Sequence, residues 1–141
     1  MKKGTKKMVN YNHYLKELGI KETDYPFNRE DVVEPSRYLP DEEGFVPAEF
    51  FSLDYSMALY IYSHLCYFRD NCLVGYPAGM TFEKWENILD TMIEAFKLII
   101  IKDDKEIKLY DEAFKEYSKR KQRKIRQGLR YFGKYFYCLW Y

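Results

Sequence analysis

The chain has 141 residues, 47% of them hydrophobic, and a formal net charge of +1, which predicts one folded domain with a single core. No apolar run approaches the ~20 residues of a membrane-spanning helix, so we expect no membrane partner. The three cysteines cannot all pair with one another, and no apolar stretch follows the basic start. Both features favour a reducing, cytoplasmic compartment.

The small net charge conceals a strong separation of charge along the chain. Residues 22–51 hold nine acidic and two basic residues, whereas residues 102–141 hold twelve basic and six acidic residues. Such segments can neutralise each other within a fold, which is the commoner outcome, or present separate faces to a partner.

The start of the chain is expected to contain little regular structure. Residues 1–8 are predicted to form a flexible basic arm, and residues 9–141 a single helical domain. Within that domain, residues 9–19 predict a short helix that ends at Gly19.

Residues 20–50 predict an irregular acidic strap, because prolines recur too closely for a long helix. A solvated linker would not hold so many apolar groups, so we expect this strap to pack across the helices. A short strand near residues 31–33 is compatible with the pattern. The prolines are Pro26, Pro35, Pro40 and Pro47.

The first long helix is predicted over residues 52–70, with Ser52 as its N-cap. Asn71 and the segment 75–77, which contains glycine and proline, should end it. Apolar residues at helical spacing predict one buried stripe. The stripe comprises Leu53, Met57, Ile61, Leu65 and Phe68.

The second long helix is predicted over residues 81–101, with Thr81 as its N-cap. Its apolar stripe should face the core, and four acidic residues should lie on the other side. The stripe is Trp85, Leu89, Met92, Phe96 and Ile100, widened by Phe82, Ile88 and Ile93. The acidic residues are Glu83, Glu86, Asp90 and Glu94.

A third helix is predicted from about residue 107 to the end, after a charged turn at 102–106. Residues 118–124 contain no apolar side chain, so the helix should either leave the core there or be interrupted. Gly128 and Gly133 lower helix propensity by about 1 kcal/mol each, or else allow another backbone to approach closely. The late apolar stripe is Ile125, Leu129, Phe132, Phe136 and Leu139 or Trp140.

These elements define a mostly α fold: a small helical domain of three main helices with an irregular, proline-containing N-terminal strap. The helices 52–70 and 81–101 are expected to form an antiparallel pair. The C-terminal helix is expected to dock its aromatic end on them.

No residue constellation predicts catalysis, a metal site or a cofactor. His64 and Cys66 lie two residues apart on a helix and point in different directions, so they cannot chelate one ion together. Neither His13 nor His64 stands in a nucleophile motif, and the glycines form no phosphate-binding loop. We therefore expect a non-enzymatic protein.

Two charged clusters are the candidate binding residues. The basic cluster, which predicts contacts to nucleic acid or to another partner, is Lys119, Arg120, Lys121, Arg123, Lys124 and Arg126. The acidic cluster can mimic nucleic acid in a basic groove. It comprises Glu83, Glu86, Asp90, Glu94, Asp41, Glu42 and Glu43.

Three blocks of the chain resemble a family of short, mostly uncharacterised proteins of phages and prophages. The blocks are FFSLDYSMALYIYSHLCYFRD, GYPAGMTFEKWENILDTMIEAF and QGLRYFGKYFYCLWY, and the likeness covers residues 50–100 and 126–141. The resemblance brings no activity and no functional residue set with it. It implies a phage accessory protein in the cytoplasm of an infected bacterium.

Three functional hypotheses follow. The first is a protein that binds a host protein or nucleoprotein and inhibits antiviral defence. The second is an RNA- or DNA-binding protein that uses the basic C-terminal helix. The third is a structural or oligomeric virion component held together by the aromatic end of the chain.

Overall fold

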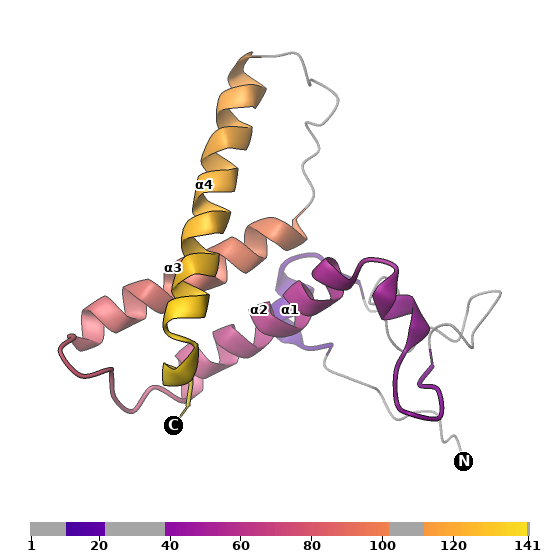
Figure 1. The fold of residues 1–141 in the computed structure, drawn as a ribbon, viewed down its shortest axis with the longest axis horizontal. Coiled ribbons are helices and arrows are strands. Elements are labelled where there is room, and N and C mark those ends of the chain that lie inside the picture. Colours follow the sequence, from indigo (N-terminus) through magenta and orange to yellow (C-terminus); the bar gives the residue numbers. More distant parts are fainter. Residues whose placement is uncertain (1–10, 22–38, 102–111, 141) are drawn as a thin grey trace. The chain divides into compact units, whose positions relative to one another are not determined.

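A computed structural model describes residues 11–21, 39–101 and 112–140, with the side chains of 112–114 excepted (Figure 1). The helices in these residues are α1 (His13–Glu17), α2 (Leu53–Asn71), α3 (Phe82–Ile100) and α4 (Glu112–Lys134), and the 3-10 turns are η4 (Pro47–Phe50) and η6 (Phe136–Cys138). The predicted mostly α fold with three main helices is confirmed, and these are α2, α3 and α4.

The chain divides into two compact units, residues 1–63 and 64–141, and each unit is described by itself. The predicted single domain over residues 9–141 stays a prediction. The arm at 1–8, the strand near 31–33 and the turn at 102–106 lie outside the described residues.

In the first unit, α1 forms the short helix that the sequence predicts. The side chain of Asn12 caps it by accepting hydrogen bonds from the backbone N–H groups of Tyr14 and Leu15, at 3.2 and 3.3 Å. Gly19 has a φ of +89°, a conformation that glycine adopts without a steric penalty, so the predicted stop is confirmed. Leu15 is fully buried and anchors α1 in its unit.

The end of the strap folds into a tight turn followed by η4. The carboxylate of Asp41 accepts hydrogen bonds from the backbone N–H groups of Glu43 and Phe45, each at 2.9 Å. Gly44 supplies the left-handed residue of the turn, with a φ of +93°. The hydroxyl of Ser56 then donates to the carbonyl of Glu49 at 3.0 Å, which joins η4 to the start of α2.

The helix α2 ends at Asn71 as predicted, but its buried face is not the predicted stripe. Leu65 of that stripe is buried, but Leu53 is exposed and so is Met57, at 51%. The smaller Ser56 and Ala58, on either side of Met57, are buried instead. The stripe was misplaced because apolar and aromatic residues occur on every side of this helix, so spacing alone selects no face. The buried residues of α2 are Ser56, Ala58, Leu59, Tyr62, Ser63, Leu65 and Cys66.

In the second unit, α3 follows its predicted pattern closely. The hydroxyl of Thr81 accepts a hydrogen bond from the backbone N–H of Lys84 at 3.1 Å, which confirms the N-cap. All five residues of the predicted stripe are buried, together with Ile88 and Ala95. Phe82, by contrast, is exposed, because it stands at the first helical position, ahead of the packed turns.

Within the second unit, the helix α4 crosses α3 at Gly128 (Figure 1). A Cβ atom on Gly128 would lie 2.2 Å from the Cβ of Ala95 and 2.6 Å from the carbonyl oxygen of Thr91. The glycine is therefore what lets the two backbones approach. The predicted antiparallel pairing of the helices 52–70 and 81–101 stays a prediction, because helix α2 spans the boundary between the two units.

Aromatic rings extend the contact between α3 and α4 beyond the crossing. The rings of Phe96 and Phe132 meet edge to face at 5.2 Å, and those of Trp85 and Tyr135 at 5.8 Å. The helix ends at Lys134 rather than at the end of the chain, and η6 follows it. The predicted late stripe is thus only partly buried, with Leu129, Phe136 and Trp140 exposed.

Candidate nucleic-acid interface

Six basic residues share one side of α4. They recur at intervals of four, four, three, four and four residues, which keeps them on one helical face. All six are exposed, and the face spans about 28 Å at 1.5 Å per residue. We call this set the basic face; it comprises Lys115, Lys119, Arg123, Arg126, Arg130 and Lys134.

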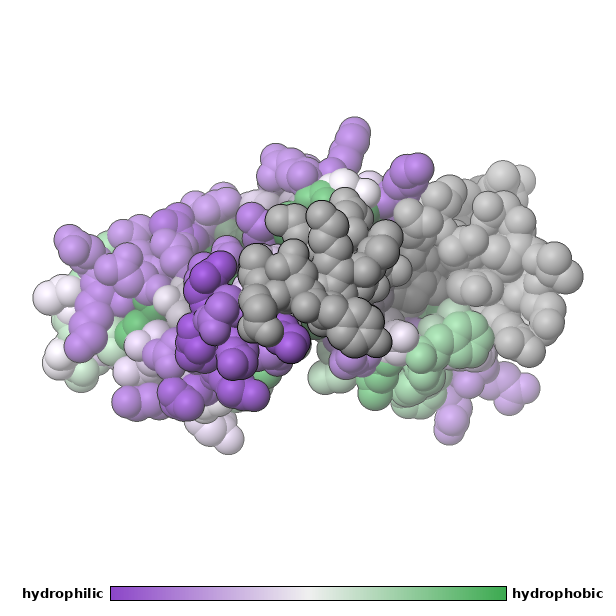
Figure 2. Space-filling view, turned by 90° about the horizontal axis from the view of Figure 1, so that it is seen from above, coloured by the Kyte–Doolittle hydropathy of each residue, from purple (hydrophilic) through white to green (hydrophobic). Residues whose placement is uncertain are grey.

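The basic face lies opposite the packed side of α4. Gly128, which meets α3, is displaced by roughly half a turn from Arg126 and Arg130 at 100° per residue. Figure 2 looks onto the end where α4 begins, and hydrophilic side chains gather over that end. Packing on α3 therefore leaves this row of charges on the solvent side.

The six basic residues predicted from the sequence do not all belong to this face. Lys119, Arg123 and Arg126 lie on it, and Arg120 is exposed on its flank. Lys124 is exposed too, but it stands one turn before Gly128 and lines a groove with Asp90 and Glu94 of α3. Lys121 is half-buried, because it stands two turns before Gly128 on the packed side of the helix.

Three members of the basic face were missed from the sequence. Lys115, Arg130 and Lys134 stand outside the dense run of charges, so local charge density did not single them out. Their spacing of three or four residues from the next member was the signal that would have found them.

Three charges at the centre of this face, those of Lys119, Arg123 and Arg126, are available to a ligand. Within the part of the chain that the structure describes, no carboxylate forms an ion pair with Lys119, Arg123 or Arg126. Arg130 donates to the side-chain oxygen of Gln127 at 2.9 Å, and the ammonium of Lys134 stands 5.3 Å from the ring centre of Tyr135. Both contacts orient a side chain without neutralising its charge.

The predicted acidic residues of α3 are partly neutralised within the second unit. The guanidinium of Arg69 donates to both carboxylate oxygens of Asp90, and the longer of these hydrogen bonds measures 3.2 Å. The hydrogen bond to Asp90 raises the pKa of the Arg69 guanidinium above its usual value. Asp90 and Glu94 also line a groove of ≈ 400 Å³ with Lys124, while Glu83 is exposed.

The acidic residues of the strap have different roles. The carboxylate of Asp41 is committed to the backbone of its own turn, so it acts as a turn former. Glu42 and Glu43 are exposed on that turn. The acidic cluster is therefore less uniform as a surface than its sequence pattern indicates.

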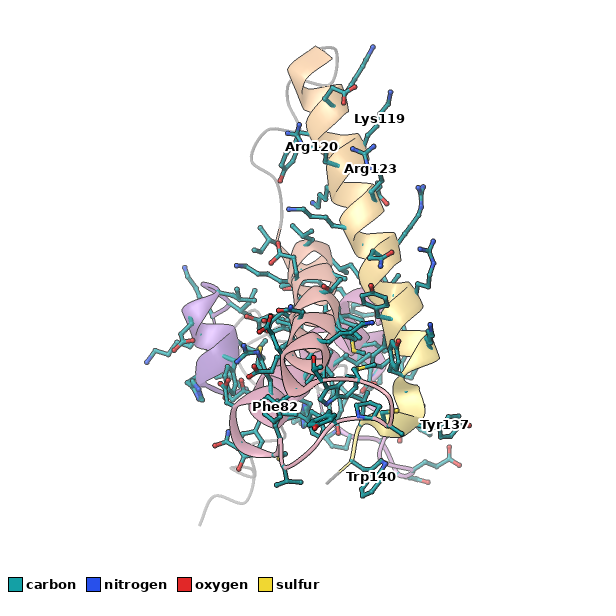
Figure 3. The ribbon with its side chains drawn as sticks, turned by 90° about the vertical axis from the view of Figure 1, so that its left-hand side faces the viewer. Phe82, Lys119, Arg120, Arg123, Tyr137 and Trp140 are labelled. Atoms are coloured by element: carbon teal, nitrogen blue, oxygen red, sulfur yellow. The ribbon has the colours of Figure 1, made fainter. Side chains whose placement is uncertain are left out.

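An aromatic cluster follows α4 and is largely exposed. It consists of Phe136, Tyr137 and Trp140, which we call the aromatic end. We expected the aromatic end of the C-terminal helix to dock on the other helices. Phe132 and Tyr135 do pack on α3, but Tyr137 points away from the helices (Figure 3) and Trp140 is 74% exposed.

Beside the aromatic end lies an apolar pocket of ≈ 320 Å³. Cys72 and Cys138 line it together with Trp85 and Trp140. In the described ranges, no three His, Cys, Asp or Glu side chains are grouped so that they could hold a metal ion. None of the described helices is long and apolar enough to cross a bilayer.

Comparison with protein-family models, with curated proteins and with solved structures returns no match to this chain. The resemblance to phage and prophage proteins, and with it the infected bacterial host, stays a prediction.

The Arg69–Asp90 pair allows a test of how much surface charge contributes to stability. Replacing Asp90 by Asn should lower the free energy of unfolding by no more than about 1 kcal/mol, because both side chains are partly exposed. Urea denaturation of Asp90→Asn beside the parent protein measures this. A loss of several kcal/mol would show that the pair is a core interaction.

Proposed function

We propose that the protein binds nucleic acid through the basic face of α4. The observation that carries this proposal is a row of six exposed basic side chains on the side of the helix opposite its packed face. A row of this length can contact several phosphates along a strand, whereas a single charged residue of a protein partner would contact only one of its members.

The dimensions of the basic face suit a polyanion. About 28 Å of helix corresponds to roughly eight base steps at 3.4 Å each. Lys119, Arg123 and Arg126 have no counter-ion among the described residues, and each can release condensed cations when it meets a phosphate. Non-specific contact of this kind requires no base-reading helix or loop.

A protein partner bound through the acidic cluster has weaker support. Asp90 is already paired with Arg69, and Asp41 is occupied within its own turn. A mimic of nucleic acid needs its carboxylates to be free for a basic groove. The host-protein partner, the inhibition of antiviral defence and the virion component remain predictions from the sequence.

The dependence of binding on salt tests the proposal directly. A plot of log K against log salt concentration should have a slope of about −3 to −5, as expected for four to six phosphate contacts. Fluorescence anisotropy with a labelled oligonucleotide, between about 50 and 200 mM salt, measures the slope. Absence of binding at the lowest salt, or a slope near zero, would contradict a phosphate-binding role.

A further inference from the structure

The aromatic end is the most exposed apolar feature of the second unit. Tyr137 is 89% exposed, Trp140 74% and Phe136 53%. Large rings are rarely left so open on a soluble protein unless they contact something else. These three rings follow Lys134, the last member of the basic face, within six residues.

The basic face and the aromatic end form one track along the second unit. Figure 3 shows Lys119 and Arg123 toward one end of α4, and Tyr137 and Trp140 at the other end. Lys134 stands where the two surfaces join, with its ammonium over the ring of Tyr135. A ligand that lies along this track meets positive charge first and flat rings next.

We infer that the ligand is single-stranded nucleic acid, whose phosphates follow the basic face and whose unpaired bases stack on Tyr137 and Trp140. This inference rests on the proposed function. Every base has a flat π-face, so stacking on a ring requires no particular sequence. A duplex keeps its bases stacked on one another, so it can use the basic face but not the rings.

The two tryptophans of the chain provide a direct readout. Trp85 is only 2% exposed, whereas Trp140 is open to solvent, so a base that stacks on Trp140 should quench its fluorescence alone. We expect an oligothymidylate of about 20 nucleotides to quench the red-shifted part of the emission. A duplex of equal length should bind without that quenching.

The variant Tyr137→Ala/Trp140→Ala removes the stacking surface and leaves the basic face intact. Single-strand binding should weaken about 30-fold or more, since each stacked base contributes at least about 1 kcal/mol, while duplex binding stays within about twofold. Trp140→Phe keeps a ring and should retain most of the affinity. As a control, Met57→Ala/Tyr67→Ala removes two exposed apolar groups outside the pocket that Trp140 lines, and it should leave both affinities unchanged.

The outcomes separate this inference from the proposal on which it rests. If neither oligonucleotide binds, the proposed function fails. If both bind equally and the double variant changes neither, nucleic-acid binding stands and the stacking role is overturned. Sedimentation that shows a dimer lost in the double variant would instead assign the rings to a contact between copies. Equal quenching by anionic vesicles would assign them to a lipid surface, and either result overturns the inference.

Discussion

Replacing Gly128 by Ala should destabilise the protein by about 2 kcal/mol. The added Cβ would stand 2.2 Å from the Cβ of Ala95 and 2.6 Å from a backbone oxygen of α3, so the helices must move apart. Overpacking of this kind costs about 3 kcal/mol, and the better helix propensity of alanine offsets about 1 kcal/mol. Urea or thermal denaturation, followed by circular dichroism, measures the difference.

Gly133→Ala is the matched control for this prediction. Gly133 lies in the same helix, but a Cβ there meets no atom within 4 Å. The substitution should therefore stabilise the protein by up to about 1 kcal/mol, the opposite sign from Gly128→Ala. If the two variants shift stability equally and in the same direction, α3 and α4 do not cross at Gly128.

A compensating change makes the test sharper. Adding Ala95→Gly to Gly128→Ala removes the nearer of the two clashing atoms, while the carbonyl oxygen of Thr91 remains in place. We expect partial recovery of stability, so the two substitutions should be non-additive in a double-mutant cycle. Strict additivity would indicate that the two residues do not touch.

Reversing three charges of the basic face should strongly weaken the binding of nucleic acid. Each phosphate contact contributes about tenfold to affinity at 50 mM salt, so the triple variant Lys119→Glu/Arg123→Glu/Arg126→Glu should lose about 1000-fold. The salt slope should also fall by about 2 to 3. Anisotropy titrations at several salt concentrations give both quantities.

The control for charge reversal changes the same number of charges elsewhere. Lys16, Lys21 and Lys84 are exposed and lie outside α4. The variant Lys16→Glu/Lys21→Glu/Lys84→Glu has the same net charge as the test variant, so total charge cannot account for a difference between them. Equal losses in the two variants would rule out a localised interface on α4.

The sequence predicted α3 well and α2 poorly, for a physical reason. In α3, apolar and acidic residues occupy opposite sides, and Thr81 provides an unambiguous cap, so spacing selects one face. In α2, apolar residues surround the helix, and the buried positions include two serines. Which side of such a helix is covered depends on its neighbours in space, and a single sequence does not specify those.

The sequence predicted a basic interface on the C-terminal helix, but it did not identify all the residues that form this interface. A dense run of charge between Lys119 and Arg126 was visible, but which of those residues face solvent depended on where α4 meets α3. From the sequence, Gly128 could either lower the helix propensity or allow another backbone to approach, and the sequence did not decide between these two roles. Once Gly128 fixes the packed side, the opposite side and its three additional basic residues follow from helix geometry.

Because the side of α4 that packs on α3 lies opposite the basic face, folding and ligand affinity can be changed independently. Gly128 packs against α3, whereas the side chains of the basic face are exposed to solvent. A charge-reversed chain should therefore accumulate in cells as well as the parent does. If the charge-reversed chain and the parent then differ in phenotype, the difference reports molecular recognition and not protein abundance.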